Sequence, residues 1–391
     1  MSAAGISAVG DGLADVSLGL LAVSLTTDAR LVTGVLVASR VPWLLFGRTI
    51  ARRVDGDRAP VRWMIGADAG RLIALAAMAA LVVAGAATIP LIYLTAFVIG
   101  IGEIVHTAAA NVILPSVASG DDLPKANGYL NAAQTGGYAM TGPALAGVVY
   151  AAGRALPFAA DAVTFGLSGA LLLPLADVEG RDAPSPATAA PSTQGSPFAV
   201  SRRHPLLRIL LVQFACLGLT QAMVLSLLPL YGRSWLLLGP GMYGLFLGGN
   251  SVGNVLGGVL GPRLWTGRRH TASFILGSGT VAGIAYVVAS RVHQPVLACA
   301  VLACEAFAVG VMNTIVPTLR MEHAPPALRG QISTLFRQVI FVSMPIGAIL
   351  SGFLARRYGI EASFSAAGSI VIATMLATDR PLRRAVAAVG A

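Results

Sequence analysis

Apolar residues run in long blocks along the chain, and short polar segments separate them. A helix needs about 20 apolar residues to cross the hydrocarbon core of a bilayer, and most of these blocks reach that length. The pattern therefore predicts twelve membrane-spanning helices. We expect them at 5–26, 31–50, 64–85, 90–114, 128–151, 157–176, 206–230, 240–262, 271–290, 294–318, 331–354 and 360–378.

One polar stretch divides these helices into two sets of six. The segment DVEGRDAPSPATAAPSTQGSP, residues 177–197, is rich in proline, alanine, serine and threonine. Such a composition cannot pack a core and is typical of a flexible linker. We therefore expect an N-terminal six-helix half at 1–176, a cytoplasmic linker at 177–204 and a C-terminal six-helix half at 205–391.

The two halves share a pattern of polar residues and glycines. Glu103, Asn111 and Pro115 recur at the same spacing as Glu305, Asn313 and Pro317, and Leu123, Gly142 and Gly147 recur as Leu328, Gly347 and Gly352. Two six-helix halves inserted in the same orientation form a parallel repeat, which is associated with alternating-access transport. Chance similarity between glycine- and alanine-rich helices is the alternative explanation.

The composition excludes an ordinary soluble protein. The chain is 55% hydrophobic and 11% charged, whereas soluble domains carry about 25% charged residues. The net charge of +10 does not indicate nucleic acid, because the basic residues are confined to short segments between apolar blocks. All three cysteines lie inside apolar blocks, so we expect no disulfide framework and no metal site.

The arginines predict the orientation of the chain in the membrane. They gather in loops on one side, at Arg52, Arg53, Arg58, Arg62, Arg202, Arg203, Arg263, Arg268, Arg269, Arg380, Arg383 and Arg384. Loops with an excess of basic residues face the cytoplasm. We therefore expect a multi-pass protein of a bacterial cytoplasmic (inner) membrane with both termini cytoplasmic. The first residues lack a basic region, so no cleavable signal peptide is expected.

Several stretches together resemble the major facilitator superfamily over nearly the whole chain. They are VGDGLADVSLGLLAVSLTTDARLVTG, RVPWLLF, GADAGR, GIGEIVHTAAANVILPSV, DLPKANG, TGPALAG, ALRGQISTLFRQ and MPIGAILSGFLARRYG. The chain looks most like the bacterial branch with enterobactin-exporter-like and macrolide-efflux-like members. The resemblance implies an all-α membrane protein with twelve helices in two parallel-repeat halves. It also implies a secondary active transporter that exports a small amphipathic molecule, such as an antibiotic, a siderophore or another metabolite.

The stretch TGPALAG resembles the antiporter motif of the fifth helix in exporters of this family. The resemblance implies that Gly142, Pro143 and Gly147 bend the helix and let it pack against the eighth helix. Small residues allow close helix approach in lipid. The eighth predicted helix offers a glycine every four residues, at Gly249, Gly253, Gly257 and Gly261, which we expect to form the matching surface. Glycine-rich packing unrelated to motion is the alternative.

The loop after the second helix departs from the family pattern. An ungapped extension from PWLLF puts Asp55 at the usual acidic position, but Ala51 and Gly56 stand where a glycine and an arginine are usual. This departure predicts an altered cytoplasmic gate. The remaining gate candidates are Arg58 in the same loop, and Asp68 and Arg71, which we expect to brace it.

Ionisable residues inside membrane helices are costly, so each is a functional candidate. Asp11 and Asp15 lie four residues apart on one helix face, and Glu103 and Glu305 hold matching places in the two halves. Burial disfavours a charged carboxylate, so protonation can alternate with substrate binding. We expect proton-coupled antiport with Glu103 as the proton carrier and Glu305 as the second candidate. A structural role, with the carboxylates bonded to neighbouring helices, is the alternative.

Other polar residues gather on the helices that line the cavity in the superfamily. The first, fourth, seventh and tenth helices hold most of them. The cavity or substrate candidates are His106, Asn111, Asn313, Gln213, Gln221, Arg40 and Arg337. Arg40 is expected to pair with Asp11 or to line the cytoplasmic vestibule, and Asp161 to cap a helix or bond to a neighbouring one.

Enzyme motifs are absent or misplaced. GNSVG, residues 249–253, fits the nucleophile pattern G-x-S-x-G but lies inside an apolar block, where the strand and turn of that motif cannot form. No HExxH and no GxxxxGK sequence occurs. We expect no enzyme and no cofactor, but a monomer whose partners are a small-molecule substrate, protons and the lipid bilayer. An uptake carrier and a non-transporting sensor remain alternatives.

Overall fold

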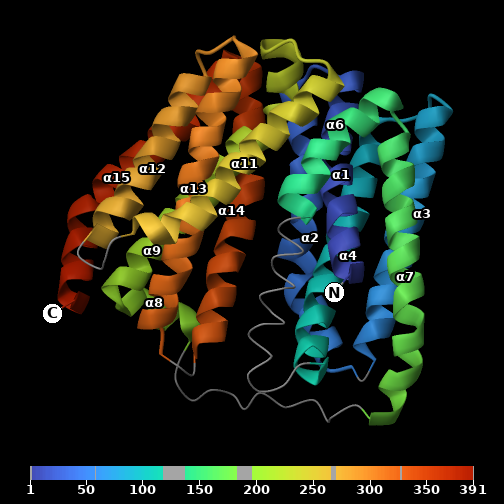
Figure 1. Cartoon of the computed structure of the whole chain (residues 1–391), viewed down its shortest axis with the longest axis horizontal. Helices are drawn as coiled ribbons and strands as arrows, with labels where there is room; N and C mark the ends of the chain where they lie inside the picture. The colour runs from blue at the N-terminus through green and yellow to red at the C-terminus, as the bar shows by residue number, and fades with distance from the viewer. Residues whose placement is uncertain are drawn as a thin grey trace. The chain divides into compact units, whose positions relative to one another are not determined.

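The computed structural model describes residues 2–57, 59–117, 137–182, 196–265, 270–325 and 328–390. Every regular element in these segments is helical. The first half of the chain forms α1 (Ser2–Leu25), α2 (Ala29–Asp55), α3 (Pro60–Val83), α4 (Ile89–Val117), the π-helical turn η1 (Gly137–Thr141), α6 (Gly142–Ala152) and α7 (Leu156–Asp182) (Figure 1).

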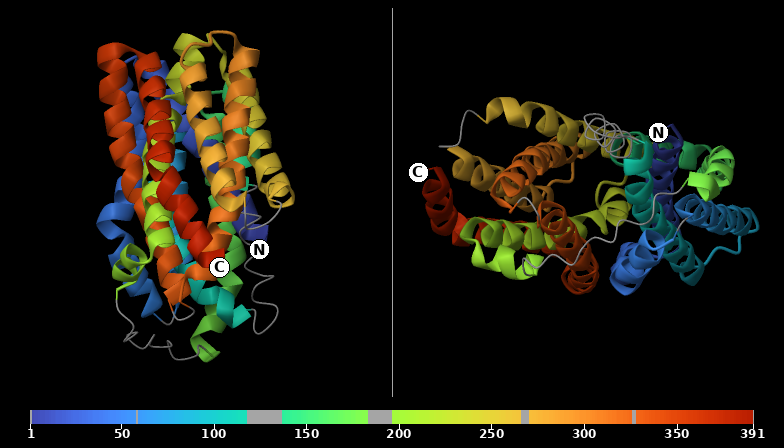
Figure 2. Two further views of the ribbon diagram at one scale, coloured as in Figure 1. Left: turned by 90° about the vertical axis from the view of Figure 1, so that its left-hand side faces the viewer. Right: turned by 90° about the horizontal axis from the view of Figure 1, so that it is seen from below.

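The second half of the chain has short helical elements before and after its first long helix. It contains α8 (Pro197–Arg203), α9 (Pro205–Leu225), α10 (Leu228–Leu230), the π-helical turn η2 (Tyr231–Trp235), α11 (Pro240–Leu264), α12 (Thr271–Ala289), α13 (Pro295–His323), α14 (Arg329–Tyr358) and α15 (Ile360–Gly390). Within each half the long helices run alongside one another (Figures 1 and 2).

The described helices account for all the predicted membrane spans. Ten helical stretches in the described part of the chain are long and apolar enough to cross a bilayer. The other two predicted spans correspond to α6, with 11 residues, and to α11, with 25 residues. Backbone groups have no water to bond with in lipid, so helices are the natural way to satisfy them. The prediction of an all-α, twelve-helix membrane protein is confirmed.

The ends of the predicted linker are helical. Helix α7 continues to Asp182, and α8 begins directly after Ser196 with Pro197 at its start. Proline is well suited to the first turn of a helix, because its missing N–H would have no intrahelical partner there. Residues 183–195 lie outside the described part, and the division into halves at 176 and 205 stays a prediction.

Contacts divide the chain into two units. The first contains Met1–Thr188 and Gly232–Gly248, and the second contains Ala189–Tyr231 and Gly249–Ala391. Helix α11 therefore contributes its first turns to one unit and its later turns to the other.

The two units repeat the same helix pairings. In the first, α3 packs against α4 and α7, and α1 packs against α7, η1 and α6. In the second, α12 packs against α13 and α15, and α9 packs against α15 and α14. The third helix of each half thus contacts the fourth and sixth, and the first contacts the fifth and sixth. This correspondence agrees with the parallel repeat predicted from the shared residues.

Candidate functional site

A group of polar side chains from four elements of the first unit surrounds Arg40. Its Nη1 lies 2.9 Å from Oε2 of Glu103, and its Nη2 donates to the hydroxyl of Tyr138 at 2.8 Å. The Tyr138 hydroxyl in turn donates to Oδ2 of Asp15 at 2.5 Å, which lies 3.7 Å from Arg40 Nη2. We call Asp15, Arg40, Glu103 and Tyr138 the outer group, because the carboxylate side chains are 29% and 33% exposed.

A close crossing of α2 and α4 brings Arg40 and Glu103 within reach. Gly100 lies one turn before Glu103, and a Cβ built there would lie 3.1 Å from Cγ of Pro42 and would collide with the Ser39 carbonyl oxygen. Only glycine permits this approach. Trp43, one turn after Ser39, also donates to Oε2 of Glu103 at 3.4 Å.

A second group lies deeper in the same unit. Asp11 Oδ1 is 3.7 Å from Arg71 Nη1, and Asp68 Oδ1 is 3.2 Å from His106 Nε2, without the alignment of a hydrogen bond. Asp68 and Arg71 are each only 1% exposed, and the Arg71 guanidinium lies 4.8 Å over the Phe165 ring. We call Asp11, Asp68, Arg71 and His106 the inner group.

The observed pairings differ from one sequence expectation. Arg40 pairs with Glu103 and Asp15, whereas Asp11 pairs with Arg71. Asp11 and Asp15 do share one face of α1, but they point to arginines from different helices. Asp68 and Arg71 are buried against α1 and α4 as part of the inner group.

Several buried polar atoms near the inner group have no hydrogen-bond partner among the residues that the structure describes. They include both carboxylate oxygens of Asp68, Nε and Nη2 of Arg71, and Oδ2 of Asp161. Asp161 is fully buried, and its Oδ1 accepts from the hydroxyl of Thr164 in the same helix at 2.8 Å, beside Gly10 of α1. Buried polar atoms usually bond to protein or ordered water. This site therefore suits water or protons, and no His/Cys/Asp/Glu group in the described segments is arranged to hold a metal ion.

Each group contains more carboxylates than guanidinium groups. The outer group has two carboxylates and one guanidinium, and so does the inner group apart from His106. With the carboxylates ionised and His106 neutral, each group carries a net charge of −1. An uncompensated charge is expensive in a protein interior, so each group can accept one proton or one cationic group.

The polar candidates of the second unit lie in different surroundings. Glu305 is 6% exposed and accepts from the Tyr286 hydroxyl at 2.7 Å. Gln213 is buried and donates to Thr378 of α15 at 2.8 Å. Gln221 is half-buried, and Asn313 and Arg337 are exposed on their helices. The second unit thus has no counterpart of the outer group among its described residues.

Three predicted site residues cannot be placed. Arg58 and the side chains of Asp55 and Asn111 lie outside the described residues. Two residues of the site were missed by sequence reasoning, Trp43 and Tyr138. The sequence offered one signal for Tyr138, because this residue lies one turn before Gly142 in a stretch of small residues. In the structure, Tyr138 falls in the π-helical turn η1. Such turns occur often at functional sites.

The glycines of TGPALAG make two close helix contacts. Gly142 meets α1 at Gly12, with 2.8 Å between a Cβ built on Gly142 and the Cα of Gly12. Gly147 meets the first turns of α11, where a Cβ would lie 2.5 Å from the Cα of Gly244. Gly248, one turn on, lies against Ala144. Pro143 is the second residue of α6, directly after Gly142.

The glycines of the eighth helix that contact α6 are not the ones that the sequence predicted. Gly253 and Gly257 face α13, where a Cβ would collide with the carbonyl oxygens of Ala303 and Phe307. Successive residues of a helix are separated by about 100°, so Gly253 lies roughly opposite Gly244. The glycine ridge therefore packs within the second unit, and Gly244 and Gly248 contact α6 instead.

The chain is similar to transporters in sequence and in fold. It is 26% identical over 345 residues to macrolide efflux protein A of Streptococcus pyogenes. The aligned region covers 85% of this chain and 82% of that protein. The fold matches a bacterial homologue of the iron transporter ferroportin in its inward-facing state, with a TM-score of 0.74, 17% identity and coverage of 98% and 97%. It also matches a bacterial homologue of the lysosomal transporter Spinster, with a TM-score of 0.70, 17% identity and coverage of 99% and 92%.

The family assignment rests on a match along most of the sequence. The Major Facilitator Superfamily profile matches residues 2–348, and the helical pairings above repeat in both units as that fold requires. The polar groups described above lie among helices that are long and apolar enough to cross a membrane. This chain belongs to the major facilitator superfamily and is a multi-pass membrane transporter.

Proposed function

We propose that this transporter is a proton-coupled antiporter that exports a small amphipathic molecule, with both termini on the cytoplasmic side. The observation that carries the proposal is the outer group, where two partly exposed carboxylates share the single guanidinium of Arg40. Similarity to a macrolide efflux protein supports export and makes macrolides the first compounds to test.

The coupling step follows from the charge of the outer group. A proton on Glu103 neutralises the group and releases Arg40 from its 2.9 Å contact, while Asp15 and Tyr138 continue to hold Arg40. Loss of that proton restores the Arg40–Glu103 pair. Because these residues belong to α1, α2, α4 and η1, a change of partner alters the contacts between several helices at once.

Glu103 suits the role of proton carrier better than Glu305. The Glu103 side chain is 33% exposed, so protons can reach it. Glu305 is 6% exposed and is bonded to Tyr286 within its own unit. We therefore assign proton coupling to Glu103, with Asp15 as its partner, and a structural role to Glu305.

Reconstituted vesicles test this proposal. The protein is placed in liposomes that contain a pH-sensitive dye, and macrolides and other amphipathic compounds are added in turn. Antiport predicts that an exported compound moves protons in the opposite direction and that an imposed pH gradient drives the compound. The Glu103→Gln variant should lose this coupling, and the matched Glu305→Gln variant should keep it.

Each other result has a defined meaning. Co-directional movement of compound and protons would identify an uptake carrier. No movement of any compound, with intact folding, would favour a non-transporting role. Equal coupling in the wild type and in the Glu103→Gln variant would contradict the assignment of the proton carrier.

A further inference from the structure

The hydroxyl of Tyr138 lies between Arg40 and Asp15 in the outer group. Arg40 Nη2 donates to this hydroxyl at 2.8 Å, and the hydroxyl donates to Oδ2 of Asp15 at 2.5 Å. The direct distance from Arg40 Nη2 to Asp15 Oδ2 is 3.7 Å, which is too long for a hydrogen bond. Without the hydroxyl, the two charged side chains would be free to bond to each other directly. What the hydroxyl adds is a connection between this ion pair and η1.

The backbone of Tyr138 contacts the same helix as its hydroxyl. A Cβ built on Gly12 of α1 would collide with the Tyr138 carbonyl oxygen and would lie 3.1 Å from Cδ of Pro143. Gly12 and Asp15 are three residues apart and therefore lie on one face of α1. Tyr138 thus meets this face at two points, at Gly12 through its carbonyl group and at Asp15 through its hydroxyl.

Tyr138 also lies directly before the glycines and the proline of TGPALAG. The π-helical turn η1 ends at Thr141, and α6 begins at Gly142. Such turns are rare and occur often at functional sites. A change in the forces on the Tyr138 side chain therefore acts on the backbone where α6 begins, which is where the sequence predicts a bend.

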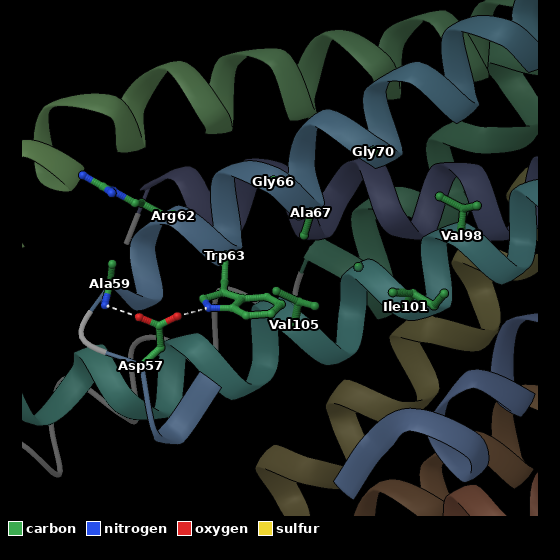
Figure 3. A pocket seen from close by; sticks show the side chains of 11 residues that line it. Asp57, Ala59, Arg62, Trp63, Gly66, Ala67, Gly70, Val98, Ile101 and Val105 are labelled. Carbon is green, nitrogen blue, oxygen red and sulfur yellow. Dashed lines mark hydrogen bonds between the residues drawn. The ribbon is translucent and has the colours of Figure 1, made fainter. Parts of the chain in front are cut away.

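The other side of α4 offers a poorer route away from the outer group. Val98, Ile101 and Val105 of α4 line a pocket of about 550 Å³ on the side of α3 (Figure 3). Glu103 faces the other way, toward Arg40 of α2. Coupling within proteins is carried by packed side chains and by hydrogen-bond networks. The pocket interrupts the packing on the α3 side, whereas the bonds through Tyr138 are continuous from α2 to η1 and α1.

We propose that Tyr138 is a positioning residue that transmits the charge of Glu103 to the start of α6. When Glu103 is ionised, it shares Arg40 with Tyr138 and Asp15. When Glu103 is neutral, Asp15 is the carboxylate of the outer group that attracts Arg40. The bond from Arg40 to Tyr138 then strengthens, and η1 is held more firmly against α1. The inference rests on the proton coupling proposed above, because a proton that binds and leaves Glu103 makes this link part of the transport cycle.

Hydrogen exchange in a double-variant cycle tests the link without any transport. Amide exchange is followed by mass spectrometry on peptides of the full-length protein that contain residues 137–141, at a single pH. Glu103→Gln imitates the protonated carboxyl group. We expect it to slow this exchange about three- to tenfold, because one charge-assisted hydrogen bond is strengthened. In a Tyr138→Phe background, Glu103→Gln should leave the exchange unchanged.

Two further variants make this result specific. Tyr93→Phe is the matched control, because the Tyr93 hydroxyl also joins two helices, by donating to the Leu31 carbonyl oxygen at 2.6 Å, but lies outside the outer group. In that background the effect of Glu103→Gln should persist. Asp15→Ala removes the acceptor of the Tyr138 hydroxyl and should abolish most of the effect, so the test does not depend on the folding of Tyr138→Phe alone. An equal effect with and without the Tyr138 hydroxyl, or no effect in the otherwise unaltered protein, would overturn the inference.

Transport in vesicles shows whether the link serves coupling. Tyr138→Phe should retain substrate exchange across the membrane and lose most of the export that a pH gradient drives, whereas Tyr93→Phe should keep both. If the unaltered protein moves no protons, the proposed function fails, and the hydrogen-exchange cycle still decides whether Tyr138 links Glu103 to η1. If the unaltered protein is proton-coupled and Tyr138→Phe is coupled as well as Tyr93→Phe, only the role of Tyr138 is refuted.

Discussion

Replacing Gly147 with alanine pushes a side-chain carbon into the backbone of α11. The added Cβ would lie 2.5 Å from the Cα of Gly244, and the Pro240 carbonyl oxygen and the Gly244 nitrogen lie closer still. These are backbone atoms, so no side chain can rotate away. Ordinary contact begins at 3.4 Å. Helices α6 and α11 must therefore separate by roughly 1 Å, which loses part of the packing along the contact.

The size of the effect follows from two opposing terms. Overpacking of a close contact costs about 1–3 kcal/mol, and a glycine-to-alanine change inside a helix gains up to about 1 kcal/mol. The matched control is Gly258→Ala on α11, where a Cβ meets nothing within 4 Å and only the gain applies. We expect the two variants to differ in the free energy of unfolding by about 1–3 kcal/mol, with Gly147→Ala the less stable.

Unfolding in detergent, followed by tryptophan fluorescence, measures this difference. Transport by the same variants in vesicles then asks whether the contact also serves motion. We expect Gly147→Ala to be slower than Gly258→Ala even where both are folded. If Gly147→Ala were as stable and as active as Gly258→Ala, the close packing of α6 on α11 would be refuted.

Two further predictions concern the second unit. Glu305→Leu should cost about 1–3 kcal/mol, because it leaves the buried Tyr286 hydroxyl without its acceptor. Adding Tyr286→Phe should recover much of that loss in an unfolding assay, and a double variant as unstable as Glu305→Leu alone would contradict this. His204 caps α9 by accepting from the Leu207 N–H at 3.5 Å, and burial together with the nearby His323 lowers the pKa of His204. The unfolded chain therefore binds this proton more readily, so stability should fall as the pH drops below about 6.5. A His204→Asn variant, which keeps a capping side chain without the titration, should lose less stability between pH 7.5 and pH 5.5, and an equal loss would show that His204 is not responsible.

Hydropathy predicted the fold well because lipid leaves the chain few options. Each long apolar block had to become a helix with its backbone groups bonded internally. The repeat was also accessible, since Glu103 and Glu305 occupy matching places on α4 and α13. The sequence did not predict which residues surround the two carboxylates. Arg40 lies beside Glu103, whereas Tyr286 lies beside Glu305.

The site was predicted as a set of residues but not as a set of contacts. Asp11, Asp15 and Arg40 were recognised from their cost in a membrane, yet which acid meets the arginine depends on how the helices are rotated and spaced. The sequence did not identify the neighbour of the glycine ridge for a related reason. A repeat of every four residues shows that one side of α11 is smooth, but it does not show whether α6 or α13 lies there, and Gly253 faces α13.

The central claim is that Glu103 carries the transported proton, and exchange transport in vesicles tests it most directly. Substrate exchange needs only the change of conformation, whereas net export against a gradient needs the proton as well. We predict that Glu103→Gln retains substrate exchange across the membrane and loses export driven by a pH gradient. Retention of gradient-driven export by Glu103→Gln, at the rate of the unaltered protein, would contradict the account.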